Sequence, residues 1–297
     1  MPLNVEAIKA STVLLTAVSD YTPANIRNFV LSLKYSGYSG DKVAFVFTSQ
    51  HSTIEYLRNS GFIVLLPTSE QTEWGYIHTQ PIGYPRKNVF CDRFLHYSLF
   101  LKSNSQYKYC ISTDCRDVIF QYDPYYYLLQ KLNDKDLDII GSLEDIEYPF
   151  ENWNDENLRM NFPEFHMSLR TKTIVNAGVI AGKSSVMSEL FQSIYLISIG
   201  GRKHSSIKLT STDQSAYNIL LSQKIWSERT LYLTNADTWA AQIGSYVANQ
   251  KFFHSSSISL PQFREGIFMN EKREPYLIVH QYDRIKEWKE VVDNFYI

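Results

Sequence analysis

The sequence predicts an α/β fold in which a mixed, mostly parallel β-sheet is flanked by helices. Through the N-terminal half, short apolar runs rich in β-forming residues alternate with segments whose apolar residues recur at helical spacing. Of the 297 residues, 44% are hydrophobic and 20% are charged, a composition that can bury a large core. No internal repeat or linker-like stretch divides the chain, so we expect a single domain over residues 1–297.

The first strand is predicted at residues 12–19, where a short apolar run lies between turn residues. A helix follows, because the apolar residues between 26 and 33 are spaced for one helical face, and Gly37 and Gly40 end it. The next expected elements are a strand at 43–47, a short helix at 52–59 and a strand at 62–66. This alternation indicates parallel strands joined by helices.

The remaining elements follow the same patterns, with Pro124 starting one of the helices at its first turn. We expect helices at 92–102, 124–132, 184–199 and 212–222, and strands at 107–113, 138–143, 174–181, 231–234 and 276–280. Two polar segments, 67–90 and 144–170, are predicted to be long loops. Because uninterrupted loops of such length usually serve a function, we expect 144–170 to be a lid or a binding element.

Composition and charge narrow the classes of function. The net charge of −2 gives no general electrostatic attraction for nucleic acid, so no nucleic-acid partner is expected. Aromatic residues make up 14% of the chain, which fits either a bulky core or surfaces that stack on bases or sugars. Three cysteines form no zinc or disulfide pattern, and Cys110 is expected to be buried. No apolar stretch approaches the ~20 residues of a membrane span, so we expect no integral membrane segment and a cytoplasmic location.

Two carboxylates directly follow the predicted strand 107–113, within the sequence Thr113-Asp114-Cys115-Arg116-Asp117. Charged residues at the carboxyl end of such a strand lie where α/β sheets bind ligands. Asp114 and Asp117 can supply hard oxygen ligands to a divalent cation. The structural alternative is a turn in which Asp114 caps the backbone and Arg116 pairs with Asp117.

Three later segments carry polar residues in unusual places. Asn176 and Gly178 interrupt a predicted strand, which indicates either close backbone approach to another group or a β-bulge. Asp213 and Gln214 follow Ser211-Thr212 at a helix start, which is also ordinary helix-capping chemistry. His280 ends a late strand, where it is either a structural residue or a metal ligand.

Taken together and in this order, these motifs resemble those of nucleotide-sugar glycosyltransferases of the GT-A fold. The resemblance is closest to families with a strand-end acidic motif, then NAG(V/L), then DQ, then a C-terminal histidine. Two further segments agree with it, Ala17-Val18-Ser19-Asp20-Tyr21 at the first strand-to-helix turn and Asp92-Arg93-Phe94 on the helix before the acidic motif. The matching positions run from about residue 12 to residue 284. The sequence departs from these families at one position, because Arg116 stands where they carry the second aspartate of Asp-x-Asp. Arg116 then either points at a phosphate group of the donor or replaces part of the metal site.

The resemblance implies a GT-A-like, Rossmann-type fold with a nucleotide-binding half at about 1–120 and an acceptor-binding half at about 121–297. It implies metal-dependent transfer of a sugar from a nucleotide-sugar donor, UDP- or GDP-linked, to a glycan or another hydroxyl-bearing acceptor. Mn²⁺ or Mg²⁺ is expected on Asp114, Asp117 and His280. Donor-binding residues are expected to be Ala17, Ser19, Tyr21, Arg93, Arg116, Asn176 and Ala177, with Tyr21 stacking on the base. The catalytic candidates are Gln214, Asp213 and Asp145.

The resembling families retain the configuration of the sugar, and the position of Gln214 then lies near the sugar face opposite the leaving group. An inverting enzyme would instead need a carboxylate base, for which Glu144, Asp145 and Asp213 are available. In the segment 144–170, the aromatic residues are either acceptor-binding or anchors to the sheet; they are Phe150, Trp153, Phe162 and Phe165.

Other classes of function are weaker matches. Nucleotidyltransferases and dinucleotide-binding dehydrogenases use an early glycine-rich phosphate loop, and residues 15–30 contain no glycine. The strongest alternative that is not an enzyme is a sugar-nucleotide or glycan-binding module, because the Asp-x-Asp motif is imperfect.

Overall fold

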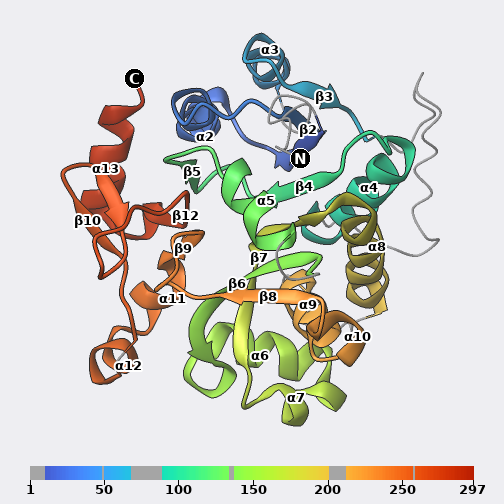
Figure 1. Cartoon of the computed structure of the whole chain (residues 1–297), viewed down its shortest axis with the longest axis vertical. Helices are drawn as coiled ribbons and strands as arrows, with labels where there is room; N and C mark the ends of the chain where they lie inside the picture. Colours follow the sequence, from blue (N-terminus) through green and yellow to red (C-terminus); the bar gives the residue numbers. More distant parts are fainter. Residues whose placement is uncertain (1–10, 49, 68–88, 134–136, 201–211, 257) are drawn as a thin grey trace.

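A seven-stranded sheet forms the centre of the computed structural model, which describes residues 11–48, 50–67, 89–133, 137–200, 212–256 and 258–297 (Figure 1). All of its strands run parallel except β7, which pairs antiparallel with β4 on one side and β6 on the other. The predicted fold class, a mixed and mostly parallel sheet flanked by helices, is therefore confirmed. In spatial order the strands are β3 (Ile63–Leu65), β2 (Asp41–Thr48), β1 (Thr12–Ser19), β4 (Tyr109–Thr113), β7 (Thr173–Lys183), β6 (Ile139–Glu147) and β8 (Thr230–Leu233).

Helices cover both faces of this sheet because its strands are apolar on both sides. Along β1, Val13 and Leu15 point into one core and Leu14 and Val18 into the other, and all four side chains are fully buried. The core that holds Leu14 is covered by α2 (Pro23–Tyr35), α3 (His51–Asn59) and α5 (Tyr125–Asn133). The core that holds Val13 is covered by α4 (Val89–Ser103), α8 (Ser184–Gly200) and α9 (Asp213–Leu221).

A second, three-stranded sheet brings the end of the chain back to the end of β4. It consists of β5 (Val118–Phe120), β12 (Ile278–His280) and β9 (Ala240–Gln242), with β12 in the middle. β12 pairs antiparallel with β5, and His280 lies opposite Val118. Since only four residues separate β4 from β5, this pairing holds His280 beside the acidic motif.

Segment 144–170 is not a long loop, and that prediction was wrong. β6 continues to Glu147, a 3₁₀ turn spans Tyr148–Phe150, and two helices follow, α6 (Asn152–Asn161) and α7 (Pro163–Leu169). The apolar residues Leu158, Phe162 and Leu169 are spaced along this segment and bury themselves against α9 and the end of β6. Because polar residues separate these apolar residues, the sequence shows no clear helical spacing of apolar residues in this segment.

The sequence also missed the smaller elements near the C-terminus. They are α10 (Lys224–Ser227), α11 (Ile243–Ala248), α12 (Gln250–Ser255), β10 (Gln262–Arg264), β11 (Ile267–Met269), the 3₁₀ turn Tyr282–Arg284 and α13 (Lys286–Phe295). Of these, α11, β10, β11 and α13 pack around the three-stranded sheet, α10 lies beside α9 and α12 packs near α6. Most of the predicted loop 67–90 lies outside the described residues. Cys110 is buried as predicted, and all three cysteines are free thiols. Among the described residues, no helix combines the length and apolarity that a bilayer crossing requires.

Candidate functional site

A cleft of about 1020 Å³ opens beyond the carboxyl ends of β1 and β4. This is the edge at which parallel α/β sheets place their ligands. Every predicted site residue except Asp145 lines the cleft: Ala17, Ser19, Tyr21, Arg93, Asp114, Arg116, Asp117, Asn176, Ala177, Asp213, Gln214 and His280. Residues from opposite ends of the chain therefore face one space.

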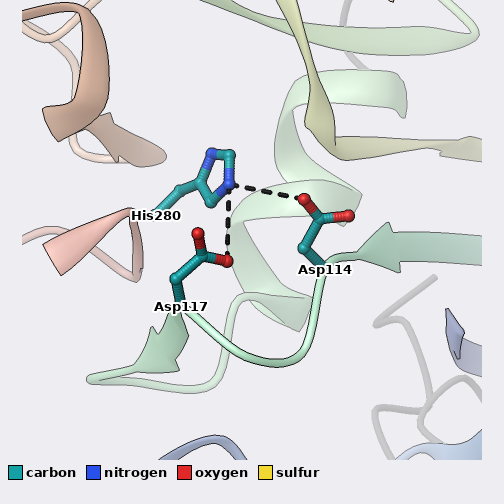
Figure 2. Close-up of side chains that lie close together, drawn as sticks. All are labelled: Asp114, Asp117 and His280. Carbon is teal, nitrogen blue, oxygen red and sulfur yellow. Dashed lines mark ion pairs between the residues drawn. The ribbon is translucent and has the colours of Figure 1, made fainter. Parts of the chain in front are cut away.

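Asp114, Asp117 and His280 point toward one another at this cleft (Figure 2). His280 Nε2 lies 3.6 Å from Asp114 Oδ2 and 3.9 Å from Asp117 Oδ1, and the ligand atoms of the three residues all lie within 4.8 Å of one another. Asp117 and His280 are almost fully buried, while Asp114 is partly exposed to the cleft. Carboxylate oxygens are ligands that Mg²⁺ and Mn²⁺ prefer, and a neutral imidazole nitrogen is a common ligand of divalent metals.

The orientation of the His280 ring fits metal ligation. Its Nδ1 lies 2.8 Å from Gln242 Oε1, so this nitrogen donates its hydrogen to the amide oxygen. The other nitrogen, Nε2, is buried without a hydrogen-bond partner among the described residues. Nε2 is therefore directed at the two carboxylates, where an ion that displaced its proton would meet the lone pair. Gln242 was not predicted, since nothing in its local sequence distinguishes it.

The three groups shift one another's proton affinity. Burial lowers the pKa of His280, but Asp114 and Asp117 outweigh this effect and hold the pKa above its ordinary value. Burial tends to raise the pKa of Asp114, yet the Arg93 guanidinium and His280 together hold it well below the usual range. Burial raises the pKa of Asp117, against the attraction of His280. The cluster thus carries mixed charge and retains Asp114 as a carboxylate.

Arg93 lines the cleft but is almost fully buried. Its guanidinium pairs with the Asp114 carboxylate and lies 3.0 Å from Asp213 Oδ2. α4 supplies this arginine and α9 supplies the aspartate, so the pair ties two helices to the end of β4. Because Asp213 is engaged by a buried cation, it is not a free general base.

Two half-exposed arginines surround Asp117. Arg116 lies 3.0 Å from Asp117 and 2.8 Å from Asp283, and Arg284 lies 3.4 Å from Asp117. The structural alternative for Arg116, pairing with Asp117, is therefore present. Both arginines nevertheless line the cleft and keep more than a third of their side chains accessible. Arg284 was missed, although its place four residues after His280 was the available signal.

Strand β7, which Asn176 and Gly178 interrupt, contains a β-bulge, and the His280 side chain lies close to its backbone at Gly178. Gly141 pairs with Ile180 and the next residue, Ser142, pairs with Asn176, so residues 177–179 bulge out of register. The bulge turns the Gly178 carbonyl toward Asp114, whose backbone N–H it accepts at 2.9 Å. A Cβ on Gly178 would lie 2.4 Å from His280 Cε1, so only glycine leaves room for the histidine.

A buried polar network holds Gln214 and Asn176 in place around Glu144. Glu144 Oε1 accepts hydrogen bonds from Asn176 Nδ2 at 2.7 Å and from Gln214 Nε2 at 3.0 Å. Gln214 Oε1 in turn accepts the Ala177 backbone N–H at 3.0 Å. Burial raises the pKa of Glu144, against the hydrogen bonds that it accepts from Ser245 and Asn176. Since both its oxygens are occupied by donors, Glu144 orients its neighbours and is not free to act as a base.

The network includes two residues that the sequence did not single out, Asn154 and Ser245. Asn154 Oδ1 accepts a hydrogen bond from Gln214 Nε2 at 2.7 Å, and Ser245 Oγ donates to Glu144 Oε2. Both residues line the cleft. They lie on α6 and α11, elements that the sequence did not predict.

Asp145 is the one predicted site residue that is not among the residues that line the cleft. Its φ of 55° turns the chain, and its Oδ2 accepts the Asn235 backbone N–H at 2.8 Å. This bond ties the end of β6 to the turn after β8. Asp145 is therefore engaged by the backbone of that turn, whereas its neighbour Glu144 lines the cleft.

Replacing Asp145 with asparagine is expected to stabilise the fold at neutral pH and to leave any activity unchanged. Burial raises the pKa of Asp145 to about 6, whereas an unfolded aspartate titrates near 4. Between these values the folded state binds the extra proton, so stability falls as pH rises, and the loss is complete above about pH 6. Asparagine, which tolerates positive φ, should add roughly 1–2 kcal/mol at pH 8 and little at pH 4. Urea unfolding at both pH values measures this; a catalytic defect without a stability change would contradict the structural role.

The aromatic residues of segment 144–170 divide into two groups. Phe162 and Phe165 pack into the core under α6 and α7, which is the anchoring alternative. Trp153 is 51% exposed and lines the cleft. Phe150 is equally exposed but stacks on Phe252, with ring centroids 4.8 Å apart, and does not line the cleft. Of the four, only Trp153 is placed to meet a ligand there.

The chain matches no protein-family model, and no curated protein is similar to it at a significant level. The site combines an acidic and imidazole cluster, three arginines and a hydrogen-bonding network along one cleft. Such an arrangement can bind an anionic, metal-chelating group at one end and a polyhydroxylated group at the other.

Proposed function

We propose that this chain is a glycosyltransferase that resembles the GT-A-fold enzymes and uses a nucleotide-sugar donor, UDP- or GDP-linked, with a glycan or another hydroxyl-bearing acceptor. The observation that carries the proposal is the meeting of Asp114, Asp117 and His280, whose ligand atoms lie within 4.8 Å of one another at a large cleft. The strand order of the central sheet and the antiparallel β7 are compatible with it. A cytoplasmic location remains part of the prediction.

Asp114, Asp117 and His280 would hold Mn²⁺ or Mg²⁺, and the buried Nε2 of His280, which faces both carboxylates without a hydrogen bond among the described residues, supports this fit. When bound, the ion would neutralise negative charge on the diphosphate leaving group. The protein's own contribution is to fix the ligands. Arg93 orients Asp114, and Gln242 holds the His280 ring in the tautomer that leaves Nε2 free.

Arg116 and Arg284 supply positive charge on the side of the cleft where phosphate oxygens would lie. Their carboxylate partners leave more than a third of each side chain accessible, so donor oxygens can share them. Tyr21 lines the same cleft at the end of β1, and we assign it the stacking role for the base. Burial raises its pKa to about 12, so it stays a neutral phenol.

Retention of configuration is the stereochemical outcome that the side chains favour. The three carboxylates considered as a base for inversion are each engaged or misplaced: Asp213 pairs with Arg93, Glu144 accepts hydrogen bonds at both oxygens, and Asp145 does not line the cleft. Gln214 lines the cleft beside Asn176 and Ala177 and would face the sugar. Product analysis by NMR of the anomeric proton tests this.

A module that binds sugar nucleotides without turnover is the second candidate, favoured by one feature. Both acidic ligands already pair with arginines, Asp114 with Arg93 and Asp117 with Arg116, which lowers their charge toward a metal. Such a module would bind the donor without consuming it.

Donor hydrolysis separates the two candidates. We expect a panel of nucleotide sugars to raise the melting temperature only in the presence of Mn²⁺, since a ligand of the folded state stabilises it. The same donor should then be hydrolysed slowly with Mn²⁺ and not with EDTA. Stabilisation without hydrolysis or transfer would select the binding module, and no stabilisation by any nucleotide sugar would reject both.

The exposed Trp153 tests where the acceptor binds. Replacing it with alanine should raise the acceptor KM roughly tenfold or more and leave the donor KM within about twofold, since one stacking face contributes on the order of 1–2 kcal/mol. Phe150→Ala is the matched control, because Phe150 is equally exposed and lies outside the cleft. Steady-state kinetics with each substrate varied in turn provides the measurement. Equal effects on both KM values would place Trp153 elsewhere in the reaction.

A further inference from the structure

A second cavity, of about 530 Å³, lies at the opposite end of the central sheet from the cleft. Its lining includes Tyr109 at the start of β4 and Lys183 at the end of β7, whereas the cleft lies beyond the end of β4. Because β4 and β7 are antiparallel neighbours, the two cavities lie at opposite ends of the same strand pair. We call this cavity the lysine pocket, after Lys102, Lys108 and Lys183 in its lining. The proposed glycosyl transfer does not use it.

The lysine pocket carries an excess of positive charge. Within the part of the chain that the structure describes, three lysines line it against a single carboxylate, that of Glu189. Lys183 is partly neutralised by Asp138, 2.9 Å away, and Lys102 Nζ donates to the neutral amide of Gln192 at 2.5 Å. Lys108 is exposed at the rim. An anion in this pocket would therefore meet at least two cations whose charge no ion pair of the described residues offsets.

The N-terminus of α8 opens on the same pocket. This helix has 17 residues, begins at Ser184 and has no acidic residue in its first turn. The first-turn N–H groups of a helix have no intrahelical partner, and together they carry a positive partial charge. Lysines gathered at a helix N-terminus repel that partial charge, so the arrangement is unfavourable unless an anion joins it. Helix N-termini are common sites for phosphate groups for the same reason.

The Ser184 hydroxyl is a second, independent indication that this pocket binds a ligand. Its side chain lines the pocket and is only 4% exposed, and its Oγ has no hydrogen-bond partner among the described residues. A buried hydroxyl without a partner is costly. Oxygen atoms of a bound anion would accept its hydrogen. Lys183, Ser184 and the amides that follow thus present an ammonium, a hydroxyl and helix N–H groups to one space.

We propose that the lysine pocket is a binding site for a phosphate group, carried either by a soluble phosphate ester or by an acidic lipid headgroup. The phosphate lies at the start of α8 and accepts hydrogen bonds from the Ser184 hydroxyl and from the first-turn amides after Ser184, since the Ser184 N–H donates to the Lys108 carbonyl at 2.9 Å. Lys102 and Lys108 neutralise it. This site is separate from the cleft, so phosphate binding here does not depend on the proposed glycosyltransferase activity.

Amide NMR of the full chain tests the site with inorganic phosphate as the probe. Phosphate titrated at constant ionic strength should shift the backbone amides of residues 184–187 and saturate. In the variant Lys102→Gln/Lys108→Gln, the dissociation constant at these amides should rise at least roughly tenfold, since two charge-assisted contacts are lost. The control Lys251→Gln/Lys272→Gln makes the same change in net charge away from the pocket and should bind as the wild type does. Unshifted amides at 184–187, or equal affinity in all three proteins, would overturn the proposal.

Vesicle co-sedimentation distinguishes the two sources of phosphate. Binding to vesicles of phosphatidylcholine with phosphatidic acid, lost in Lys102→Gln/Lys108→Gln and absent with phosphatidylcholine alone, would assign a lipid headgroup. Saturable binding of inorganic phosphate without vesicle binding would assign a soluble phosphate ester. Either result supports the site, because both require the phosphate response at residues 184–187.

Discussion

Asp117→Ala is expected to abolish metal-dependent donor binding and to lower turnover roughly 10²–10³-fold, the scale of losing one stabiliser of developing charge. The fold should survive, because the contact that joins the acidic motif to the end of β12 uses the Asp117 backbone carbonyl, which accepts the Gln281 N–H at 2.6 Å. The substitution also releases Arg116 and Arg284 from their shared carboxylate. Nucleotide affinity without metal should therefore be unchanged or higher, which isothermal titration with and without Mn²⁺ measures.

Asp283→Ala is the matched control for this experiment. Asp283 pairs with both Arg116 and Arg284, as Asp117 does, but it is not part of the group that could hold an ion. Its loss should alter nucleotide affinity and leave the metal dependence intact. Normal metal-dependent turnover in Asp117→Ala would remove Asp117 from the ligand set, and an equal loss in both variants would indicate a general electrostatic effect.

Gly178→Ala should displace His280 and weaken metal binding roughly 10–100-fold, the scale seen when the orientation of a metal ligand is disturbed. The added Cβ would lie 2.4 Å from His280 Cε1, 2.7 Å from its Nε2 and 2.9 Å from Asn176 Oδ1. Both neighbours are buried and hydrogen-bonded, so neither can move without breaking its own contacts. Turnover across a Mn²⁺ titration should show partial rescue at high metal concentration.

The same substitution at Gly200 controls for the added methyl group. A Cβ there meets no atom within 4 Å, so Gly200→Ala should leave metal affinity and turnover unchanged. Melting curves of both variants show whether Gly178→Ala remains folded. If Gly178→Ala binds Mn²⁺ as tightly as the wild type does, His280 is not a ligand.

The N-terminal half of the fold was predictable because its information is local. In β1 the bounds predicted from the apolar run match the structure, and in α2 the spacing from Ile26 to Leu33 marks the buried face. A buried parallel strand is a continuous apolar run and an amphipathic helix has a fixed period, so each can be recognised without its neighbours.

Segment 144–170 and the chain after residue 223 were predicted poorly for the opposite reason. α6 and α7 are polar over most of their surface, and their few apolar residues gain stability only by packing against α9 and β6. The short strands β5 and β9 exist because β12 lies between them. Tertiary contacts, and not local periodicity, stabilise such elements.

The candidate site shows the same division. The sequence by itself determined which residue types stand at strand ends and in which order, from Asp114 and Asp117 to His280. Only the tertiary structure decided that Gln242 orients His280, that Glu144 holds Gln214 instead of acting as a base, and that Asp145 binds the turn after β8. The physical reason is that hydrogen-bond partners and side-chain direction depend on the pairing of distant strands, whereas the identity of a strand-end residue does not.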